Sequence, residues 1–340
     1  MSKVILLIGA LGRNGVVYDG ETMKNTIFKK YFENVATKVT TVNTTKWNKK
    51  PWLPFELIYK LIRYRKATVV ISACDMSAYR LIKLLYYIRL NNNIFYWVVG
   101  GGFPALVGNQ INPKYYKFIK NILVQSPEME KKLKEKGIPN VTYFPNSKDI
   151  YKIKKDYPTQ NLIKFVYLSR IIPEKGCDLI INCAKRLHKN GYEFIIDFYG
   201  NINAYPDFQK EIADIKEIRY KGLLDLRSKE GFVELAKNDV FLFPTYYKNE
   251  GFPGVFIDAF ISGLPVITTD WNYNKEIISD GSMGLIIPPY SEEALYDAML
   301  FFINNPTQVK RMSEICLKEA HKYDSNQLLG VDNLKAIGLI

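Results

Sequence analysis

The sequence predicts an α/β protein built from two doubly wound, Rossmann-like domains that face a central cleft. Three observations carry this prediction. Short apolar segments alternate with longer segments of helical spacing along the chain, which is typical of parallel β-α-β units. A polar, lysine-rich stretch interrupts the alternation once. The length of 340 residues is sufficient for two domains of ordinary size.

The first half supplies one series of alternating elements, which we assign to a domain at residues 1–150. The expected strands are KVILLIG (3–9), KVTTVN (38–43), TVVISA (68–73), IFYWVV (94–99), NILVQS (121–126) and VTYFP (141–145). Helical spacing is found at 21–33, 53–65, 76–90 and 127–136.

Residues 151–162 are polar and rich in lysine, and they are expected to form a linker to a second domain at 163–305. Its expected strands are IKFVYLS (163–169), FIIDFYG (194–200), IRYKG (218–222), DVFLFP (239–244), LPVITT (264–269) and MGLIIP (283–288). Helices are expected near 176–190, 206–214, 226–237, 253–262, 273–279 and 291–304. The tail at 306–340 has only helical spacing, and we expect it to pack back toward the first domain.

Composition excludes several classes. The longest apolar runs fall far short of the ~18–20 residues that a membrane span needs. The N-terminal run ends at Gly9 and is typical of a buried strand rather than a signal peptide. The four cysteines match no usual zinc spacing, so we expect buried free thiols in a reducing cytosol, and no metal.

The charge is distributed unevenly between the halves. Residues 1–150 contain 24 Lys and Arg against 9 Asp and Glu, a balance of +15, whereas the remainder has a balance of −2. The first half is therefore expected to meet an anionic partner.

In open parallel sheets, ligands bind at the carboxyl ends of strands, so the loops that follow strands are the candidates for a site. Arg170 and Lys175 follow the strand at 163–169, just before a helix. A guanidinium, an ammonium and free backbone amides suit a diphosphate. Two solvated loop cations would be the alternative.

The loop after the strand at 239–244 contains two carboxylates, Glu250 and Asp258, on either side of a Gly- and Pro-rich turn. If a helix begins near Pro253, Glu250 lies in the loop and Asp258 lies about one and a half turns into the helix. The two acids could then reach different hydroxyls of one extended ligand. Alternatively, Glu250 caps the helix and Asp258 is a helix-surface acid.

Three segments together resemble a known family. They are SRIIPEKG (169–176), LAKNDVFLFPTYYKNEGFPGVFIDAFISGLPVITTD (235–270) and GLIIPPYSEEAL (284–295). On these residues the chain resembles the retaining glycosyltransferases of family 4, which have the two-domain GT-B fold and include bacterial enzymes of capsule, O-antigen and exopolysaccharide synthesis. The first half matches this family only in outline.

The resemblance implies roles by position. Arg170 and Lys175 match the pair that holds the donor diphosphate, and Glu250 matches the acid that contacts the donor sugar. The second acid, which usually holds ribose hydroxyls, falls on the shorter Asp258. Further donor-binding residues are implied at Gly251, Phe252, Pro253, Gly254, Gly200 and Gly222.

The resemblance assigns the acceptor to the first domain. Its glycine-bearing first loop implies acceptor or phosphate contacts at Gly12, Arg13 and Asn14. Many family members carry a His in a later loop of this domain, but the corresponding stretch here, VVGGGFPAL (98–106), has none. Gly101 and Gly102, in the triple glycine of this stretch, are therefore expected to approach the sugar through backbone groups.

The implied reaction moves a sugar from a nucleotide-sugar donor to a glycan or a polyprenyl-diphosphate-linked acceptor, with retention of configuration. The leaving phosphate would take the acceptor proton, and Arg170 and Lys175 would replace a metal ion, so no cofactor is expected.

Cationic, aromatic segments suggest a membrane surface. Residues 46–66, 80–90 and 114–120 combine Lys and Arg with Trp, Tyr and Phe. Basic amphipathic helices of this kind lie in anionic interfaces, which predicts a cytoplasmic enzyme bound peripherally at the inner face of the cytoplasmic membrane. Alternatively, each helix packs its apolar face on the sheet and leaves its lysines in water.

Three other functions remain as alternatives. A GT-B relative could epimerise or hydrolyse nucleotide sugars. A nicotinamide-dependent reductase would explain the first glycines, and Tyr116 and Lys120 have Tyr-x-x-x-Lys spacing, but no acid follows the second strand for the ribose. A nucleic-acid-binding module would explain the charge, but no recognition motif is present, so we expect no nucleic acid.

Overall fold

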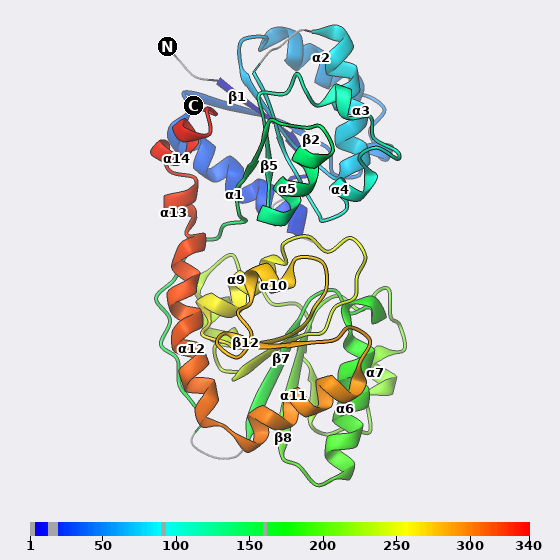
Figure 1. Ribbon diagram of the computed structural model, residues 1–340, viewed down its shortest axis with the longest axis vertical. Helices are drawn as coiled ribbons and strands as arrows, with labels where there is room; N and C mark the ends of the chain where they lie inside the picture. Colours follow the sequence, from blue (N-terminus) through cyan, green and yellow to red (C-terminus); the bar gives the residue numbers. More distant parts are fainter. Residues whose placement is uncertain (1–3, 13–19, 90–92, 159–161) are drawn as a thin grey trace. The chain divides into compact units, whose positions relative to one another are not determined.

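The computed structural model describes residues 4–12, 20–89, 93–158 and 162–340. The chain divides into two compact units (Figure 1): unit 1 is Met1–Asp149 together with Tyr323–Ile340, and unit 2 is Ile150–Lys322. Each unit contains one six-stranded sheet in which all neighbouring strands are parallel. The predicted fold class, two Rossmann-like domains, is confirmed.

Unit 1 has the strand order β2-β1-β3-β4-β5-β6. The strands are β1 (Val4–Gly9), β2 (Lys38–Asn43), β3 (Thr68–Ser72), β4 (Ile94–Trp97), β5 (Asn121–Val124) and β6 (Val141–Tyr143). The helices are α1 (Gly20–Val35), η1 (Trp47–Lys49), α2 (Leu53–Arg63), α3 (Asp75–Ile88), α4 (Phe103–Leu106), η2 (Pro113–Tyr115), α5 (Pro127–Glu135), α13 (Ser325–Leu328) and α14 (Val331–Ala336).

The two faces of the unit 1 sheet are covered by different helices. Phe28 and Phe32 of α1 pack with Leu329 and Leu334 of the C-terminal segment on one face, over strand residues such as Leu7. The chain adds β2 on one side of β1 and then returns to add β3 on the other side. Because the crossovers are right-handed, α2 and α3 lie on the opposite face of the sheet from α1.

Unit 2 has the strand order β12-β11-β10-β7-β8-β9. The strands are β7 (Ile163–Leu168), β8 (Phe194–Tyr199), β9 (Ile218–Tyr220), β10 (Val240–Phe243), β11 (Val266–Thr269) and β12 (Gly284–Ile287). The helices are η3 (Pro173–Lys175), α6 (Cys177–Lys189), α7 (Phe208–Glu211), α8 (Lys229–Leu235), α9 (Gly254–Ile261), α10 (Asn274–Ile277), α11 (Glu292–Asn304) and α12 (Thr307–Ala320); η4 (His321–Tyr323) follows.

The order of the strands in unit 2 reverses between β7 and β10. The chain runs from β7 outward to β9, returns to pair β10 with the other side of β7, and continues outward to β12. In parallel sheets the loops that follow the two strands at such a reversal diverge and leave room for a ligand. The fold therefore places the loops after β7 and β10 at the position where a ligand is expected.

The C-terminal segment divides between the two units. Helix α12 packs against α9 within unit 2, while residues 323–340 belong to unit 1, where Lys148 and Asp324 form a parallel bridge. Among the described residues, no helix combines the length and the apolar character needed to cross a bilayer. Three cysteines are buried as expected, but Cys74 is exposed, because it lies at the start of α3 outside the core.

Candidate functional site

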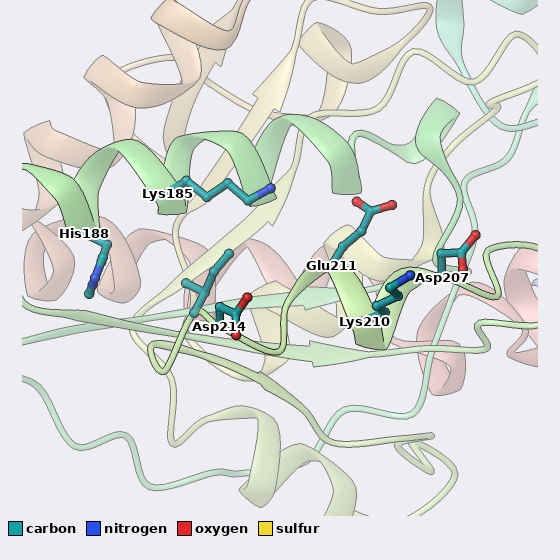
Figure 2. A pocket seen from close by; sticks show the side chains of 7 residues that line it. Lys185, His188, Asp207, Lys210, Glu211 and Asp214 are labelled. Atoms are coloured by element: carbon teal, nitrogen blue, oxygen red, sulfur yellow. The ribbon is translucent and has the colours of Figure 1, made fainter.

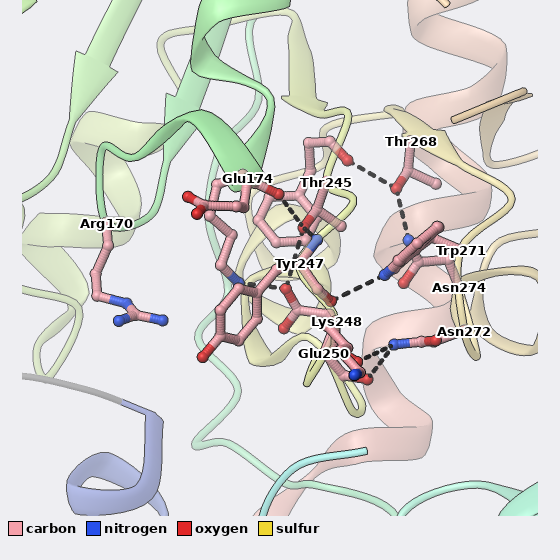
Figure 3. Close-up of polar contacts among 12 residues, drawn as sticks. Arg170, Glu174, Thr245, Tyr247, Lys248, Glu250, Thr268, Trp271, Asn272 and Asn274 are labelled. Carbon is pink, nitrogen blue, oxygen red and sulfur yellow. Dashed lines mark hydrogen bonds and ion pairs between the residues drawn. The ribbon is translucent and has the colours of Figure 1, made fainter. Parts of the chain in front are cut away.

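A buried ion pair joins the two loops at the reversal point of unit 2 (Figure 3). The Lys175 ammonium contacts Oε2 of Glu250, although 75 positions separate them in the sequence. Only 8% of the Lys175 side chain and 11% of the Glu250 side chain are exposed. The structure thus brings together two residues that the sequence predicted to share one site.

Lys175 is held by the close packing of its loop on the end of β10. Its amide donates to the carbonyl of Ile172, and Gly176 follows with a φ of 78°. A Cβ at position 176 would overlap the carbonyl oxygen of Pro244. Glycine is therefore required for this close approach of the loop to the end of β10.

Glu250 is held by neighbours from its own loop and from the loop after β11. The Thr245 hydroxyl lies 3.3 Å from Oε2 of Glu250. The side-chain amide of Asn272 donates to the carbonyls of Glu250, at 2.9 Å, and of Lys248, at 3.2 Å. These bonds fix the backbone that carries the carboxylate, as Figure 3 shows.

A second set of bonds fixes the end of β10 below this loop. The Thr268 hydroxyl donates to the carbonyl of Phe243 at 2.8 Å. The buried amide of Asn274 donates to the Thr268 hydroxyl and to the Thr269 carbonyl, both at 3.1 Å. The ends of β10 and β11 and the start of α10 are thus connected, which fixes the site before any ligand binds.

Arg170 lies at the same edge, with Tyr247 between it and the ion pair. The guanidinium carbon is 5.3 Å from the centre of the Tyr247 ring, and the Lys175 ammonium is 5.0 Å from the same centre. The indole of Trp271 donates to the Tyr247 carbonyl at 2.8 Å, which fixes the position of this ring's backbone. Such cation–ring contacts favour a defined orientation of the guanidinium.

Tyr247 is a site residue that was not predicted from the sequence. The available signal was its position, since it follows β10 in the same loop and precedes Glu250 by three residues. An aromatic residue in a loop at a strand end is more informative than one inside a strand, because the core does not account for it.

The electrostatics of this edge favour an anionic ligand. Two cations and one carboxylate stand together, and the guanidinium of Arg170 is exposed while the ion pair is buried. A ligand with several negative oxygens would meet a net positive charge here. Burial raises the pKa of the nearby Cys177 thiol to about 12, so it stays protonated at neutral pH and is not a nucleophile.

Gly200 and Gly222 belong to the loops after β8 and β9. The Gly200 amide donates to the Gly222 carbonyl at 2.8 Å, and a Cβ at position 200 would overlap the carbonyl oxygen of Ser169, next to Arg170. The glycine at 200 is thus required by the packing of the loop that carries Arg170, whereas a Cβ at 222 would meet open space.

The remaining residues predicted to bind the donor lie in the loop after β10 and in α9, into which this loop leads. Pro253 is the N-cap of α9, which excludes Glu250 from the alternative role of helix cap. Asp258 is 2% exposed, so it is not a surface acid either. Gly251 and Phe252 are buried with Pro253, and Gly254, the first residue of α9, is half-buried.

The acceptor residues predicted in the first domain lie in unit 1. Arg13 and Asn14 are outside the described residues. Gly12 has a φ of 75°, and its backbone is held by the Thr45 hydroxyl at 3.0 Å and by the Asn43 side chain at 2.9 Å.

The triple glycine lies at another strand end of unit 1. Gly101 and Gly102 are half-buried, and they follow β4 directly before α4. Both predicted glycine loops of the first domain therefore stand at carboxyl ends of strands. The two histidines are elsewhere: Nδ1 of His188 on α6 is 2.9 Å from Glu217 Oε1, and His321 follows α12.

The spacing that suggested a reductase does not form a catalytic pair. Lys120 donates to the carbonyl of Gly338 at 2.6 Å, while Tyr116 is fully buried among Tyr96 and Phe103. Burial raises the pKa of Tyr116 well above its usual range, so its hydroxyl is a poor acid.

A separate hollow of about 670 Å³ lies on unit 2 between α6 and α7 (Figure 2). Its lining residues are Lys185, His188, Asp207, Lys210, Glu211, Asp214 and Ile215. None of the predicted donor residues lines it, and its charges of both signs nearly balance, so we do not assign the donor to it. Within the described ranges of the chain, no group of three or more His, Cys, Asp or Glu side chains could hold a metal ion.

Comparison with solved structures defines the class of fold. The structure of Anabaena HepE in complex with UDP and glucose superposes with a TM-score of 0.71 at 14% identity, over 98% of each chain. The sucrose-phosphate synthase of Thermosynechococcus elongatus gives a TM-score of 0.74 at 13% identity, over 96% of each chain. The fold is therefore that of the GT-B glycosyltransferases.

The sequence comparison defines the family. The family described as glycosyl transferases group 1 matches residues 147–318, which is half of the chain. The chain belongs to this family. The alpha-D-kanosaminyltransferase of Streptomyces kanamyceticus is 26% identical over 156 residues, which cover 44% of this chain and 38% of that protein. The matched region thus spans well under half of this curated relative.

Proposed function

We propose that this chain is a retaining glycosyltransferase that moves a sugar from a nucleoside diphosphate sugar to a glycan or polyprenyl-diphosphate-linked acceptor, without a metal ion. One observation carries the proposal: Arg170, Lys175 and Glu250 meet at the strand reversal of unit 2, around Tyr247. The family supports the reaction class, and this geometry supports the proposed residues.

The arrangement suits an activated sugar. Arg170, exposed and aligned by Tyr247, would bind the diphosphate, and Lys175 would approach the same phosphates from the buried side. Glu250 would hold a sugar hydroxyl, and Asp258 would hold the ribose. The glycines at 251 and 254 would supply backbone amides. UDP in the HepE complex supports a uridine nucleotide as the first donor to test.

The proposed chemistry is a front-side substitution. The bond between the anomeric carbon and the phosphate oxygen breaks, and the acceptor oxygen bonds to the same face of that carbon. The acceptor proton passes to the departing phosphate oxygen. Arg170 and Lys175 would stabilise the negative charge that develops on that phosphate, which is the part that a divalent ion plays in other enzymes.

The acceptor and location form the second part of the proposal. The basic excess of residues 1–150 suits an anionic acceptor such as a lipid-linked diphosphate at the inner face of the cytoplasmic membrane, in bacterial surface polysaccharide synthesis. The poly(glycerol-phosphate) alpha-glucosyltransferase of Bacillus subtilis is 26% identical over 47% of this chain and 24% of its own length. Its name gives it a phosphate-containing acceptor, which supports testing anionic acceptors here.

The experiment is transfer from a nucleotide-sugar panel, with the product's anomeric configuration read by NMR. The expected result is a product with the donor's configuration, an unchanged rate in excess chelator, and a loss of about 100-fold or more for Glu250→Gln. A product of inverted configuration would refute the retaining mechanism. A rate that falls in excess chelator would refute the reaction without a metal ion. Release of free sugar without transfer, in the presence of acceptors, would favour the hydrolase alternative.

A further inference from the structure

Helix α2 has apolar residues on two opposite sides, and only one side packs on the protein. Leu61 is buried, and Leu53 and Leu57 are half-buried; this side lies against the sheet near β2. The residues on the opposite side are large and exposed. They are Trp52, Phe55, Ile58, Tyr59 and Ile62, which we call the outer face of α2. At ~100° per residue, the outer face covers an arc of about 120°.

This arrangement excludes the interpretation that α2 only packs its apolar side on the sheet and leaves its lysines in water. A helix that only packs on its sheet buries its apolar side and turns charges to water. Here Phe55 is 76% exposed and Tyr59 is 63% exposed. The buried side already accounts for the packing, so the outer face needs another explanation, because large exposed apolar patches mark interaction sites.

Cations surround the outer face. Residues 46–66 contain seven Lys and Arg but a single acid, Glu56. Glu56 is paired with Lys60 at 2.6 Å. Exposed cations stand before the helix, at Lys46 and Lys49, and at its end, at Arg63 and Lys66. Exposed Trp47 lies among the first group. The outer face is therefore an apolar surface between two cationic ends.

The neighbouring helix extends this surface. Right-handed crossovers place α2 and α3 on the same face of the unit 1 sheet, and Figure 1 shows both helices there. Helix α3 exposes Leu84, Tyr87 and Ile88, together with Arg80 and Lys83. Both helices on this face of the sheet therefore expose apolar and cationic side chains.

We infer that the outer face of α2 docks on an anionic lipid bilayer. A bilayer interface offers the acyl boundary that Phe55, Ile58 and Ile62 require and the anionic headgroups that the flanking cations require. Tryptophans such as Trp47 and Trp52 favour this interface. A protein partner would need a polar rim matched in shape and in both signs of charge, whereas this surface is almost wholly cationic and apolar.

The inference deepens the proposed function, because it says which surface would meet a lipid-linked acceptor. Its test does not depend on catalysis. The full chain is sedimented with vesicles of phosphatidylglycerol and phosphatidylcholine in equal parts, and with vesicles of phosphatidylcholine alone. The expected result is binding to the anionic vesicles only, weakened by high salt.

Variants assign the binding to residues. Phe55→Ser with Ile62→Ser should weaken the partition by about tenfold or more, because two apolar side chains no longer leave water. Arg63→Gln with Lys66→Gln should weaken it by a similar factor. Leu223→Ser is the matched control, since Leu223 is also exposed, at 74%, but lies in unit 2. It should bind as the unchanged chain does.

A spectroscopic measurement supplies an independent readout. Tryptophan emission should shift to the blue on adding anionic vesicles, and the shift should disappear in Trp47→Phe with Trp52→Phe. Unchanged thermal stability and unchanged stabilisation by UDP would show that the variants are folded and that the donor site is intact. Failure of donor binding in every variant and in the unchanged chain would count against the proposed function and leave the vesicle result valid.

Three results would overturn the inference. They are the absence of binding to anionic vesicles, binding by the double variants at 55 and 62 and at 63 and 66 that equals that of the unchanged chain, and self-association through the outer face in the absence of lipid binding.

Discussion

The ammonium of Lys175 contacts the carboxylate of Glu250 across the strand reversal of unit 2, and both groups are almost fully buried. Burying two charges costs several kcal/mol for each ion, and their mutual attraction offsets that cost only when both are present. The pair therefore has two separable properties: it affects the stability of unit 2, and it presents a fixed cation and a fixed acid to a ligand.

Lys175→Met should lower the free energy of unfolding by about 3–5 kcal/mol, because the carboxylate of Glu250 is left buried without its partner. Adding Glu250→Gln should restore much of that loss, since no isolated charge remains, while transfer activity stays lost. Urea denaturation and an activity assay measure the two quantities. A double variant that recovers activity together with stability would show that the pair is structural only.

Arg170→Lys should lower kcat/KM by about 10- to 100-fold, because an ammonium cannot form the two parallel bonds that a guanidinium forms with a phosphate. Stability should be unchanged, as the side chain is exposed. Arg227→Lys is the control, since Arg227 is also exposed but pairs with Asp225. Equal effects of the two substitutions would argue against a specific role for Arg170.

Gly200→Ala should destabilise the protein by about 2 kcal/mol or more, because the new Cβ overlaps the Ser169 carbonyl and forces the loop of Arg170 to move. Gly191→Ala measures the cost of a positive φ alone, without a steric overlap of the new Cβ. Gly191 also has a positive φ, of 75°, but a Cβ there meets open space, so about 1 kcal/mol is expected from the left-handed backbone alone. Thermal denaturation measures both, and equal losses would contradict the argument from packing.

Asp75, at the start of α3 in unit 1, should make stability fall as the pH rises from about 4 to about 6. Burial raises the pKa of this carboxyl to about 6 in the folded protein, against a hydrogen bond from the Tyr96 hydroxyl at 3.2 Å that lowers it. Between the ordinary pKa of an Asp carboxyl and about pH 6, the folded state then binds more protons than the unfolded state. The free energy of unfolding is therefore greatest at the low-pH end of this range and falls as the pH rises.

Asp75→Asn should remove this contribution, which is at most about 3 kcal/mol. The free energy of unfolding is measured across that pH range for both proteins. Parallel curves for Asp75→Asn and the unchanged chain would mean that Asp75 titrates normally.

The sequence was sufficient for the fold because most elements carry strong local signals. Continuous apolar runs such as 163–168 form buried strands, and the expected helix at 291–304 is found as Glu292–Asn304. Weakly patterned helices were overestimated: the expected helix at 206–214 is a single turn, Phe208–Glu211, in which Phe208 is the one buried residue.

The candidate site was predictable in its residues but not in its contacts. The strand-end rule placed Arg170, Lys175 and Glu250 at one edge, but an ion pair between residues 75 positions apart depends on the strand order, which the sequence does not state. The loop position of Tyr247 was readable from the sequence, but its contacts with Arg170 and Lys175 also depend on the strand order. The outer face of α2 could not be predicted from the sequence either. Periodicity indicates which residues of a helix are apolar, but not which of two apolar sides packs on the sheet.

Calorimetric titration of the chain with a panel of nucleoside diphosphate sugars tests directly whether the loops after β7 and β10 bind a sugar donor. We expect at least one member of the panel to bind and the free nucleoside diphosphate to compete with it. Arg170→Ala should weaken this binding by about 10- to 100-fold. If no member of the panel binds, or if Arg170→Ala binds its donor as tightly as the unchanged chain, the loops after β7 and β10 do not form the donor site.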